Sequence, residues 1–344
     1  VWCDEATYVN AAVGLLENGW FTLPIHQDAI GLDTNYSLAG RLYVGSLSLL
    51  MAFLKVGLWQ GRFHALLAWV ASTTLVYLVG RRWYDAPTGA IAALVYGLGF
   101  EVFIRAHIAR PDGWGTAMVL LETLLYLRAK RRPSPPLLAL TGLVGVLAVD
   151  AYWNAIHFGL AVALLVLVEF GIRRRQPGLV AAYALGGLLG AAYFVAIHAY
   201  PDAQLAYEQW FGFLPRWGYA PQNRFNMASY WLLTYFWQSD RGIVAAQTGL
   251  ALIGGVLAAF TQRRNADREL IVIAFISWAA FALLFGDQNW TQAGAWYPFL
   301  ALLIARGIQI AGRAILTQGP KRGLPALSQP AWMAILITPW LLIN

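Results

Sequence analysis

The sequence predicts an all-α, polytopic transmembrane bundle, and three observations support this prediction. Apolar residues make up 59% of the 344 residues, charged residues only 12%, and the mean hydropathy is +0.55. Many apolar runs approach the ~20 residues that cross a bilayer as a helix. The short loops between these runs carry most of the charges and leave no room for a large soluble domain. We therefore predict one transmembrane domain over residues 1–344.

The formal net charge of +7 is explained by the membrane rather than by nucleic acid. Lys and Arg gather in loops between spans, where they orient the chain during insertion, so we predict no nucleic-acid partner. The single cysteine, Cys3, excludes an intrachain disulfide and a cysteine metal cluster. Both ends look cut, because the chain opens on Val1 and stops inside an apolar run at Asn344. We expect a further transmembrane helix before Val1 and a domain after Asn344.

Residues 1–36 are expected to form a first outer loop that contains an amphipathic helix. Within 5–17, Val9, Ala12, Val13 and Leu16 share one helix face, and the helix is too short to span. It should lie on the membrane surface and end at Gly19.

The following segment, 37–56, is apolar but carries Arg41 and Lys55. Clearer spans are predicted at about 63–80, 88–108, 113–128, 136–150, 153–170, 178–199, 242–260, 270–286, 294–312 and 329–344. They are joined by short loops, with one long outer loop at 200–227.

The positive-inside rule orients these spans. The densest basic loops, 128–132, 173–175, 263–268 and 313–322, are predicted to be cytoplasmic, which places Asp112 on the outer side. If 37–56 and 63–80 both crossed, Asp4 would lie on the opposite side from Asp112. We therefore predict that 37–56 is a juxtamembrane or re-entrant helix, as Arg41 and Lys55 favour.

Asp4 and Glu5 stand at the start of the first helix. The structural interpretation of Asp4 is a helix N-cap, and the functional one is a base that accepts a proton from a hydroxyl nucleophile. The two are compatible and weigh about equally. Glu5 either orients Asp4 or stays solvated.

A second cluster lies around the outer end of 88–108 and comprises Glu101, Arg105, His107, Arg110 and Asp112. Glu101 and Arg105 are four residues apart and can pair on one helix face. A structural ion pair is the alternative, but ionisable residues at membrane depth are usually functional. Pro111 ends one helix, and Asp112 can cap the next.

Other polar positions favour structural interpretations. The segment from Asp150 to Asn154 is expected to be an ordinary polar turn, and His157 a hydrogen-bonded core histidine. The sequence lacks HExxH, CxxC and a Gly-rich phosphate loop, so an activated donor substrate would be a lipid. The long loop 200–227 is rich in aromatic residues and carries Arg216 and Arg224.

The order of several short motifs resembles the type C (GT-C) glycosyltransferases, which use polyprenyl-phosphate sugars, and within them the branch of aminoarabinose transferases and protein O-mannosyltransferases. The resembling stretches are Asp4-Glu5-Ala-Thr-Tyr8 with Leu15 to Gly19, Arg62 to Arg82, Ala109 to Asp112 leading into Leu120 to Arg128, and Tyr297-Pro298-Phe-Leu-Ala-Leu-Leu. The match covers the first third of the chain well and the remainder in hydropathy.

The resemblance implies a GT-C-like fold and an inverting transfer to a hydroxyl of a glycan, lipid or protein acceptor. It implies Asp4 as catalytic base, with Glu5 beside it, and Asp112 as a second outer acid that supports the site or, with Asp4, a divalent cation such as Mg or Mn. Basic residues would hold the donor phosphate, and Arg110, Arg216 and Arg224 are candidates from this sequence. Arg105, Glu101 and Tyr8 are also expected to bind substrate. The protein would lie in the inner or plasma membrane with its site facing outward.

This chain departs from the family by having Tyr36-Ser37-Leu38 where a basic residue paired with proline is expected. The alternative hypothesis is therefore a non-catalytic GT-C-like subunit of a larger membrane complex. A transporter suits the intramembrane charges, but no inverted repeat supports it.

Overall fold

The structure is a computed structural model. It describes residues 3–23, 32–36, 40–99, 102–103, 106–200, 202–213, 249–250, 253–258, 260, 265–284, 296–318, 328, 331 and 338. Within these ranges the secondary structure is helical throughout. The side chains of Cys3, Asp4, 210–213, 278, 280–284 and 318 are outside the description.

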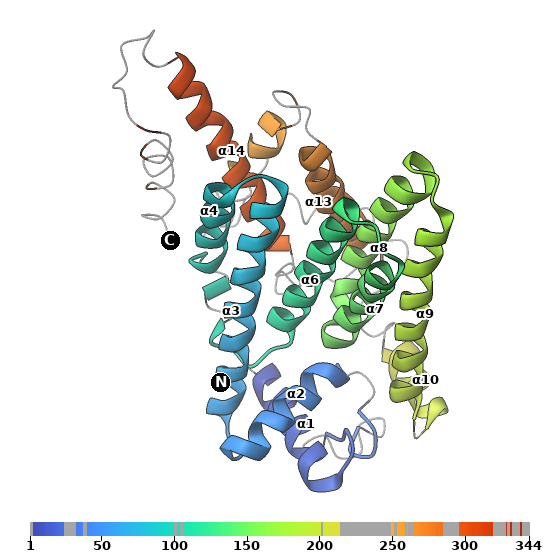
Figure 1. Cartoon of the computed structure of the whole chain (residues 1–344). Helices are drawn as coiled ribbons and strands as arrows, with labels where there is room; N and C mark the ends of the chain where they lie inside the picture. The colour runs from blue at the N-terminus through green and yellow to red at the C-terminus, as the bar shows by residue number, and fades with distance from the viewer. Residues whose placement is uncertain are drawn as a thin grey trace.

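Long apolar helices run side by side and form the bundle (Figure 1). They are α3 (Leu58–Trp83), α6 (Asp112–Arg131), α7 (Pro135–Ala151), α9 (Pro177–Ala199), α13 (Asn265–Leu284) and α14 (Tyr297–Gln318). The segment 153–173 joins a 3₁₀ turn, α8 (Ile156–Val166) and a π-helical turn, η2 (Leu167–Arg173). Four helices of the described part are long and apolar enough to cross a membrane. The chain is thus an integral membrane protein, and the total of about ten spans stays a prediction.

Two helices differ from the expected pattern. Within the predicted span 88–108 the structure describes the 12-residue helix α4 (Ala86–Gly97), which begins where the Asp85 carboxylate accepts the Thr88 N–H at 2.9 Å, and residues 102, 103 and 106 are also helical. The predicted loop 200–227 contains α10 (Ala203–Phe213). Asp202 caps α10 by accepting the N–H groups of Gln204 and Leu205, both at 3.0 Å.

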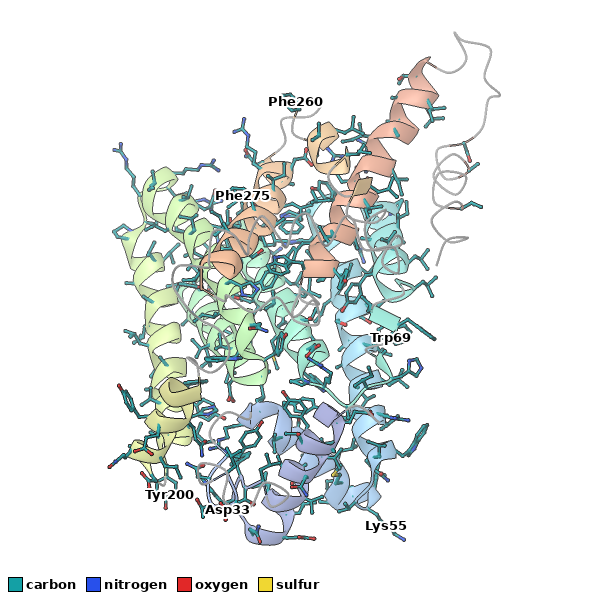
Figure 2. All side chains as sticks on the ribbon, turned by 180° about the vertical axis from the view of Figure 1, so that it is seen from behind. Asp33, Lys55, Trp69, Tyr200, Phe260 and Phe275 are labelled. Atoms are coloured by element: carbon teal, nitrogen blue, oxygen red, sulfur yellow. The ribbon has the colours of Figure 1, made fainter. Side chains whose placement is uncertain are left out.

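At one end of the bundle, α1 (Cys3–Asn18) and α2 (Arg41–Leu54) pack against each other across the ends of the long helices (Figure 1). Asp33, Lys55 and Tyr200 lie at this same end in Figure 2. Gly19 follows α1 with φ of 69°, the left-handed conformation that glycine tolerates best, as the sequence predicted. The 14-residue α2 is too short to span, which agrees with the juxtamembrane prediction for 37–56.

Asp150 anchors α2 to the bundle, so the polar-turn interpretation of this residue was wrong. The side chain is 1% exposed, and its carboxylate accepts the N–H groups of Arg41 and Leu42 at 3.0 Å each, at the start of α2. It also contacts Nε2 of His198 at 2.8 Å. A carboxylate from α7 therefore satisfies the free amides at the N-terminus of another helix.

The Arg41 side chain is buried beneath this contact. Its Nη2 donates to Asn35 Oδ1 at 2.9 Å, and its guanidinium lies 4.2 Å from the centre of the Phe21 ring. Burial lowers the pKa of Arg41 to about 10, while Asp150 opposes the shift. Arg41 therefore keeps its charge at neutral pH.

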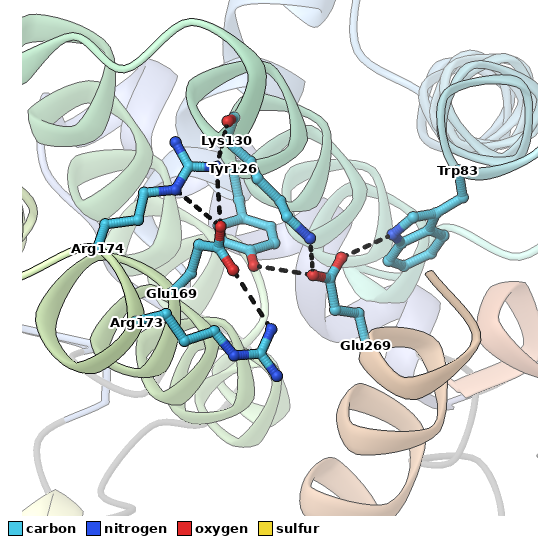
Figure 3. Close-up of polar contacts among 7 residues, drawn as sticks. All are labelled: Trp83, Tyr126, Lys130, Glu169, Arg173, Arg174 and Glu269. Carbon is cyan, nitrogen blue, oxygen red and sulfur yellow. Dashed lines mark hydrogen bonds and ion pairs between the residues drawn. The ribbon is translucent and has the colours of Figure 1, made fainter. Parts of the chain in front are cut away.

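At the opposite end, two buried carboxylates, Glu269 and Glu169, lie among basic residues (Figure 3). Glu269 of α13 pairs with Lys130 of α6 and accepts the Trp83 indole N–H at 3.3 Å. Glu169 of η2 accepts Arg174 Nε at 2.8 Å. Glu269 therefore ties α13 to α3 and α6. Arg174, which Glu169 holds, ties the end of η2 to α6, because its Nη2 donates to the Lys130 carbonyl oxygen at 2.8 Å.

The α7–α9 contact relies on glycine. A Cβ on Gly186 would overlap the Ala139 carbonyl oxygen, and one on Gly142 would overlap the Tyr183 carbonyl oxygen. Close helix approach through small residues is the usual means of packing helices in lipid.

We therefore expect Gly186→Ala to lower the free energy of unfolding by about 1–3 kcal/mol, because the added methyl overpacks the interface. Gly159→Ala is the matched control, since a Cβ there meets no atom within 4 Å, and a helical Gly→Ala change is otherwise favourable by up to about 1 kcal/mol. Thermal unfolding in detergent measures both. Equal stability of the two variants would contradict the packing analysis.

Candidate active site

The Glu5 carboxylate joins three parts of the chain at the α1–α2 end. Its oxygens accept Arg62 Nε at 3.0 Å and Arg62 Nη2 at 3.1 Å, and Oε1 also accepts the Ala109 N–H at 3.1 Å. Glu5 is fully buried. Glu5 is therefore not solvated. Its bidentate pair with Arg62 of α3 and its contact with the Ala109 amide hold the start of α1 against the segment that leads into α6.

The segment held in this way carries the second ion pair of the site. Arg110 Nε lies 3.4 Å from the Asp112 carboxylate, and Asp112 is 3% exposed. Asp112 is the first residue of α6, where the helix dipole favours a negative charge. α6 thus begins with a buried carboxylate that lies beside Arg110, and Arg110 directly follows Ala109, whose amide contacts Glu5.

Arg110 and Asp112 line a small cavity enclosed by α3, α4 and the start of α6. Its wall also includes Trp69, Ser72 and Tyr96, and Trp69 lies on α3 between the two ends of the molecule (Figure 2). Tyr96 OH donates to Ser72 Oγ at 3.1 Å. The cavity volume is about 30 Å³, which holds about two water-sized groups such as phosphoryl oxygens or a hydroxyl.

An aromatic layer closes the site on the α2 side. The Tyr43 ring makes edge contacts with Tyr8 at 5.4 Å and His64 at 5.1 Å between centroids. His64 is fixed by Trp114 Nε1–H, which donates to its Nδ1 at 3.2 Å, and by Ser46 Oγ at 2.9 Å from its Nε2. Tyr8, expected to bind substrate, therefore lies in this aromatic layer, against Tyr43.

Tyr43 is a site residue that sequence reasoning missed. It is 1% exposed, and its hydroxyl has no hydrogen-bond partner among the described residues. Burial raises the pKa of Tyr43, Asp112 and Glu5 raise it further, and Arg110 opposes them. The neutral Tyr43 hydroxyl thus lies within electrostatic range of both Asp112 and Glu5. The only signal in the sequence was that Tyr43 is a second aromatic residue, on a neighbouring predicted helix, besides Tyr8.

The remaining predicted residues are placed only in part. Asp4 lies in the first turn of α1, inside the helix rather than before it, and next to Glu5. Its side chain lies outside the described part, as do Glu101, Arg105, Arg216 and Arg224. The structure therefore brings Glu5, Tyr8, Arg110 and Asp112 to one end of the bundle and describes no position for the other side chains.

No group of three His, Cys, Asp or Glu that could hold a metal ion occurs among the residues described. The Glu5 oxygens already accept three donors, which does not fit a metal ligand. Asp112 and Asp4 remain the carboxylates that would hold a Mg²⁺ or Mn²⁺ ion. Metal dependence stays a prediction.

Because Glu5 satisfies a buried amide and an arginine, we expect Glu5→Ala to destabilise the protein by about 2–3 kcal/mol. Arg62 is 41% exposed and can be hydrated in the variant, which keeps the loss below that of a fully buried pair. Glu17→Ala, an exposed position on α1, serves as control. Thermal unfolding and proteolysis of α1 report the effect, and stability equal to that of Glu17→Ala would contradict it.

Tyr43→Phe removes a buried hydroxyl that has no hydrogen-bond partner among the described residues, so we expect unchanged or slightly higher stability, by up to about 1 kcal/mol. Tyr96→Phe, which loses the bond to Ser72, should instead cost about 1 kcal/mol. Thermal unfolding of the two variants, measured side by side, compares their stabilities. A clear loss for Tyr43→Phe would mean that its hydroxyl is satisfied within the folded protein.

Residues 46–200 match the family described as dolichyl-phosphate-mannose-protein mannosyltransferase. Among solved structures, ArnT from Cupriavidus metallidurans, bound to undecaprenyl phosphate, matches all of this chain with TM-score 0.67 and 15% identity. The oligosaccharyltransferase AglB from Archaeoglobus fulgidus, in complex with an inhibitory peptide and a dolichol-phosphate, matches 99% of it with TM-score 0.60 and 12% identity. No curated protein sequence matches the chain.

These likenesses confirm the resemblance to the type C, polyprenyl-phosphate-sugar-dependent glycosyltransferases and show that the chain has their fold. The chain spans 67% of the length of the ArnT structure and 51% of the AglB structure.

Proposed function

We propose that this chain, which has the fold of the type C glycosyltransferases, is a membrane glycosyltransferase. It transfers a sugar from a polyprenyl-phosphate donor to a hydroxyl acceptor, with inversion, on the outer side of an inner or plasma membrane. ArnT and AglB are solved with undecaprenyl phosphate and dolichol-phosphate, which supports a lipid phosphate as the donor class.

The observation that carries the proposal is the contact between Glu5 and the Ala109 amide. It connects residues 104 positions apart in sequence and brings the first turn of α1, which contains Asp4, to the segment that contains Arg110 and Asp112. The proposed reaction needs a proton acceptor and a cationic ligand for the phosphate close together. Asp4 and Arg110 belong to the two segments that this contact joins.

In the proposed reaction, Asp4 accepts the proton of the acceptor hydroxyl as its oxygen bonds to the anomeric carbon. The bond from this carbon to the phosphate oxygen breaks, and polyprenyl phosphate leaves with the electron pair. Arg110, at the cavity wall, stabilises the negative charge of the leaving phosphate. Asp112 holds Arg110 in place through their ion pair.

A second, apolar cavity of about 10 Å³ adjoins the first, and this volume holds about one water-sized group. It lies between α4 and α14, is lined by Val95, Leu300 and Ile304, and shares Tyr96 and Val102 with the first cavity. We expect a lipid donor to place its phosphate at Arg110 and to separate α4 from α14 where its first isoprene units enter, because the apolar cavity between these helices is smaller than one such unit.

We expect Asp4→Asn to lower the transfer rate by about 10²–10⁴-fold, the usual contribution of a general base. Asp33→Asn, a carboxylate at the same end of the molecule, should retain activity. Release of polyprenyl phosphate from a panel of polyprenyl-phosphate sugars measures the rate. Activity of Asp4→Asn within about twofold of the control would remove Asp4 from the role of base, and inactivity of the wild-type protein with every donor would favour the non-catalytic subunit.

A further inference from the structure

A groove with a volume of about 850 Å³ opens between α3 and α6 at the end of the bundle opposite to α1 and α2. Its rim carries five arginines: Arg81, Arg82, Arg128, Arg131 and Arg132. Arg81 and Arg82 belong to the last turn of α3, and the other three lie in or directly after the last turn of α6. Both helices therefore bring their basic ends to the same hollow.

The floor of the groove is apolar and consists of four partly buried leucines: Leu78, Leu121, Leu124 and Leu125. Leu78 is one turn before the arginines of α3, and Leu121 to Leu125 are one to two turns before those of α6. Each helix thus changes from leucine to arginine along one face, from the membrane interior toward its surface. Long arginine side chains at such helix ends reach the level of the lipid headgroups.

No carboxylate of the described residues neutralises the charges of this rim. Within the described ranges, none of the five arginines forms an ion pair with a carboxylate, and Arg131 Nη2 donates to the Arg82 carbonyl oxygen at 2.7 Å. Other basic residues at this end do have acidic partners, such as Lys130 with Glu269 and Arg174 with Glu169 (Figure 3). Arg82 instead lies within electrostatic range of three other arginines.

The positive-inside rule explains why this end of the bundle is basic. It does not explain why arginines of two helices that have no acidic partner in the described ranges converge on one leucine-floored groove, while neighbouring cations have such partners. An anion that binds there would offset the mutual repulsion of the arginines, and an attached apolar chain would cover the leucines.

We propose that the groove between α3 and α6 binds an anionic glycerophospholipid of the leaflet predicted to be cytoplasmic. Its phosphate contacts the arginine rim, with Arg82, Arg128 and Arg131 at the centre, and one acyl chain lies on the leucine floor. Basic pockets between transmembrane helices on this side of a membrane are suited to acidic headgroups. The site is separate from the candidate active site, which lies at the other end of the bundle.

Native mass spectrometry of the full chain in detergent, titrated with phosphatidylglycerol, tests the proposal. We expect Arg128→Gln with Arg131→Gln to weaken phosphatidylglycerol binding by roughly 25-fold, about fivefold for each arginine. The matched control is Arg175→Gln with Arg268→Gln, which removes the same charge from exposed residues outside the groove and should change binding by less than about twofold. Thermal unfolding verifies that both double variants are folded.

Three results would overturn the proposal: equal weakening in both double variants, equal affinity of the wild type for phosphatidylcholine, or no dependence on acyl chain length. In the last case, competition by inorganic phosphate would identify a simple phosphate site. Stronger binding of polyprenyl phosphate than of phosphatidylglycerol, lost in the same arginine variant, would assign the groove to a different lipid.

Discussion

The candidate site depends on a single buried carboxylate, that of Glu5. A charged group without solvent is stable in a protein only when its oxygens are satisfied, and here a bidentate arginine from α3 and a backbone amide satisfy them. Since these donors come from different segments, Glu5 can be buried only when α1 is docked in one position. The position of Asp4 relative to Arg110 and Asp112 follows from this constraint.

Much of this arrangement could be predicted from local patterns. The amphipathic face from Val9 to Leu16 and the glycine at position 19 gave the extent of α1 closely. Arg41 and Lys55 distinguished α2 from a span, because two cations within a short apolar run disfavour crossing. With α2 outside the membrane, the order of spans alone put the start of α1 and the start of α6 at the same end.

Other features depend on partners that local sequence does not reveal. Asp150 looks like part of a polar turn, and its burial follows only from the amides of α2, more than a hundred residues away. In the sequence, Tyr43 is one aromatic residue in an apolar helix, and only the structure shows that Asp112 and Glu5 lie near it. α10 was missed because 200–227 was read as one long outer loop rich in aromatic residues, although Asp202 was an N-cap signal.

The central claim is that the α1–α2 end holds a lipid phosphate beside Arg110 and Asp112. An experimental structure of the full chain with bound polyprenyl phosphate tests it most directly. The account predicts phosphate density within hydrogen-bond distance of the Arg110 guanidinium and the prenyl chain between α4 and α14. Phosphate density at the arginine rim of the α3–α6 groove, with the cavity at Asp112 lacking it, would contradict the account.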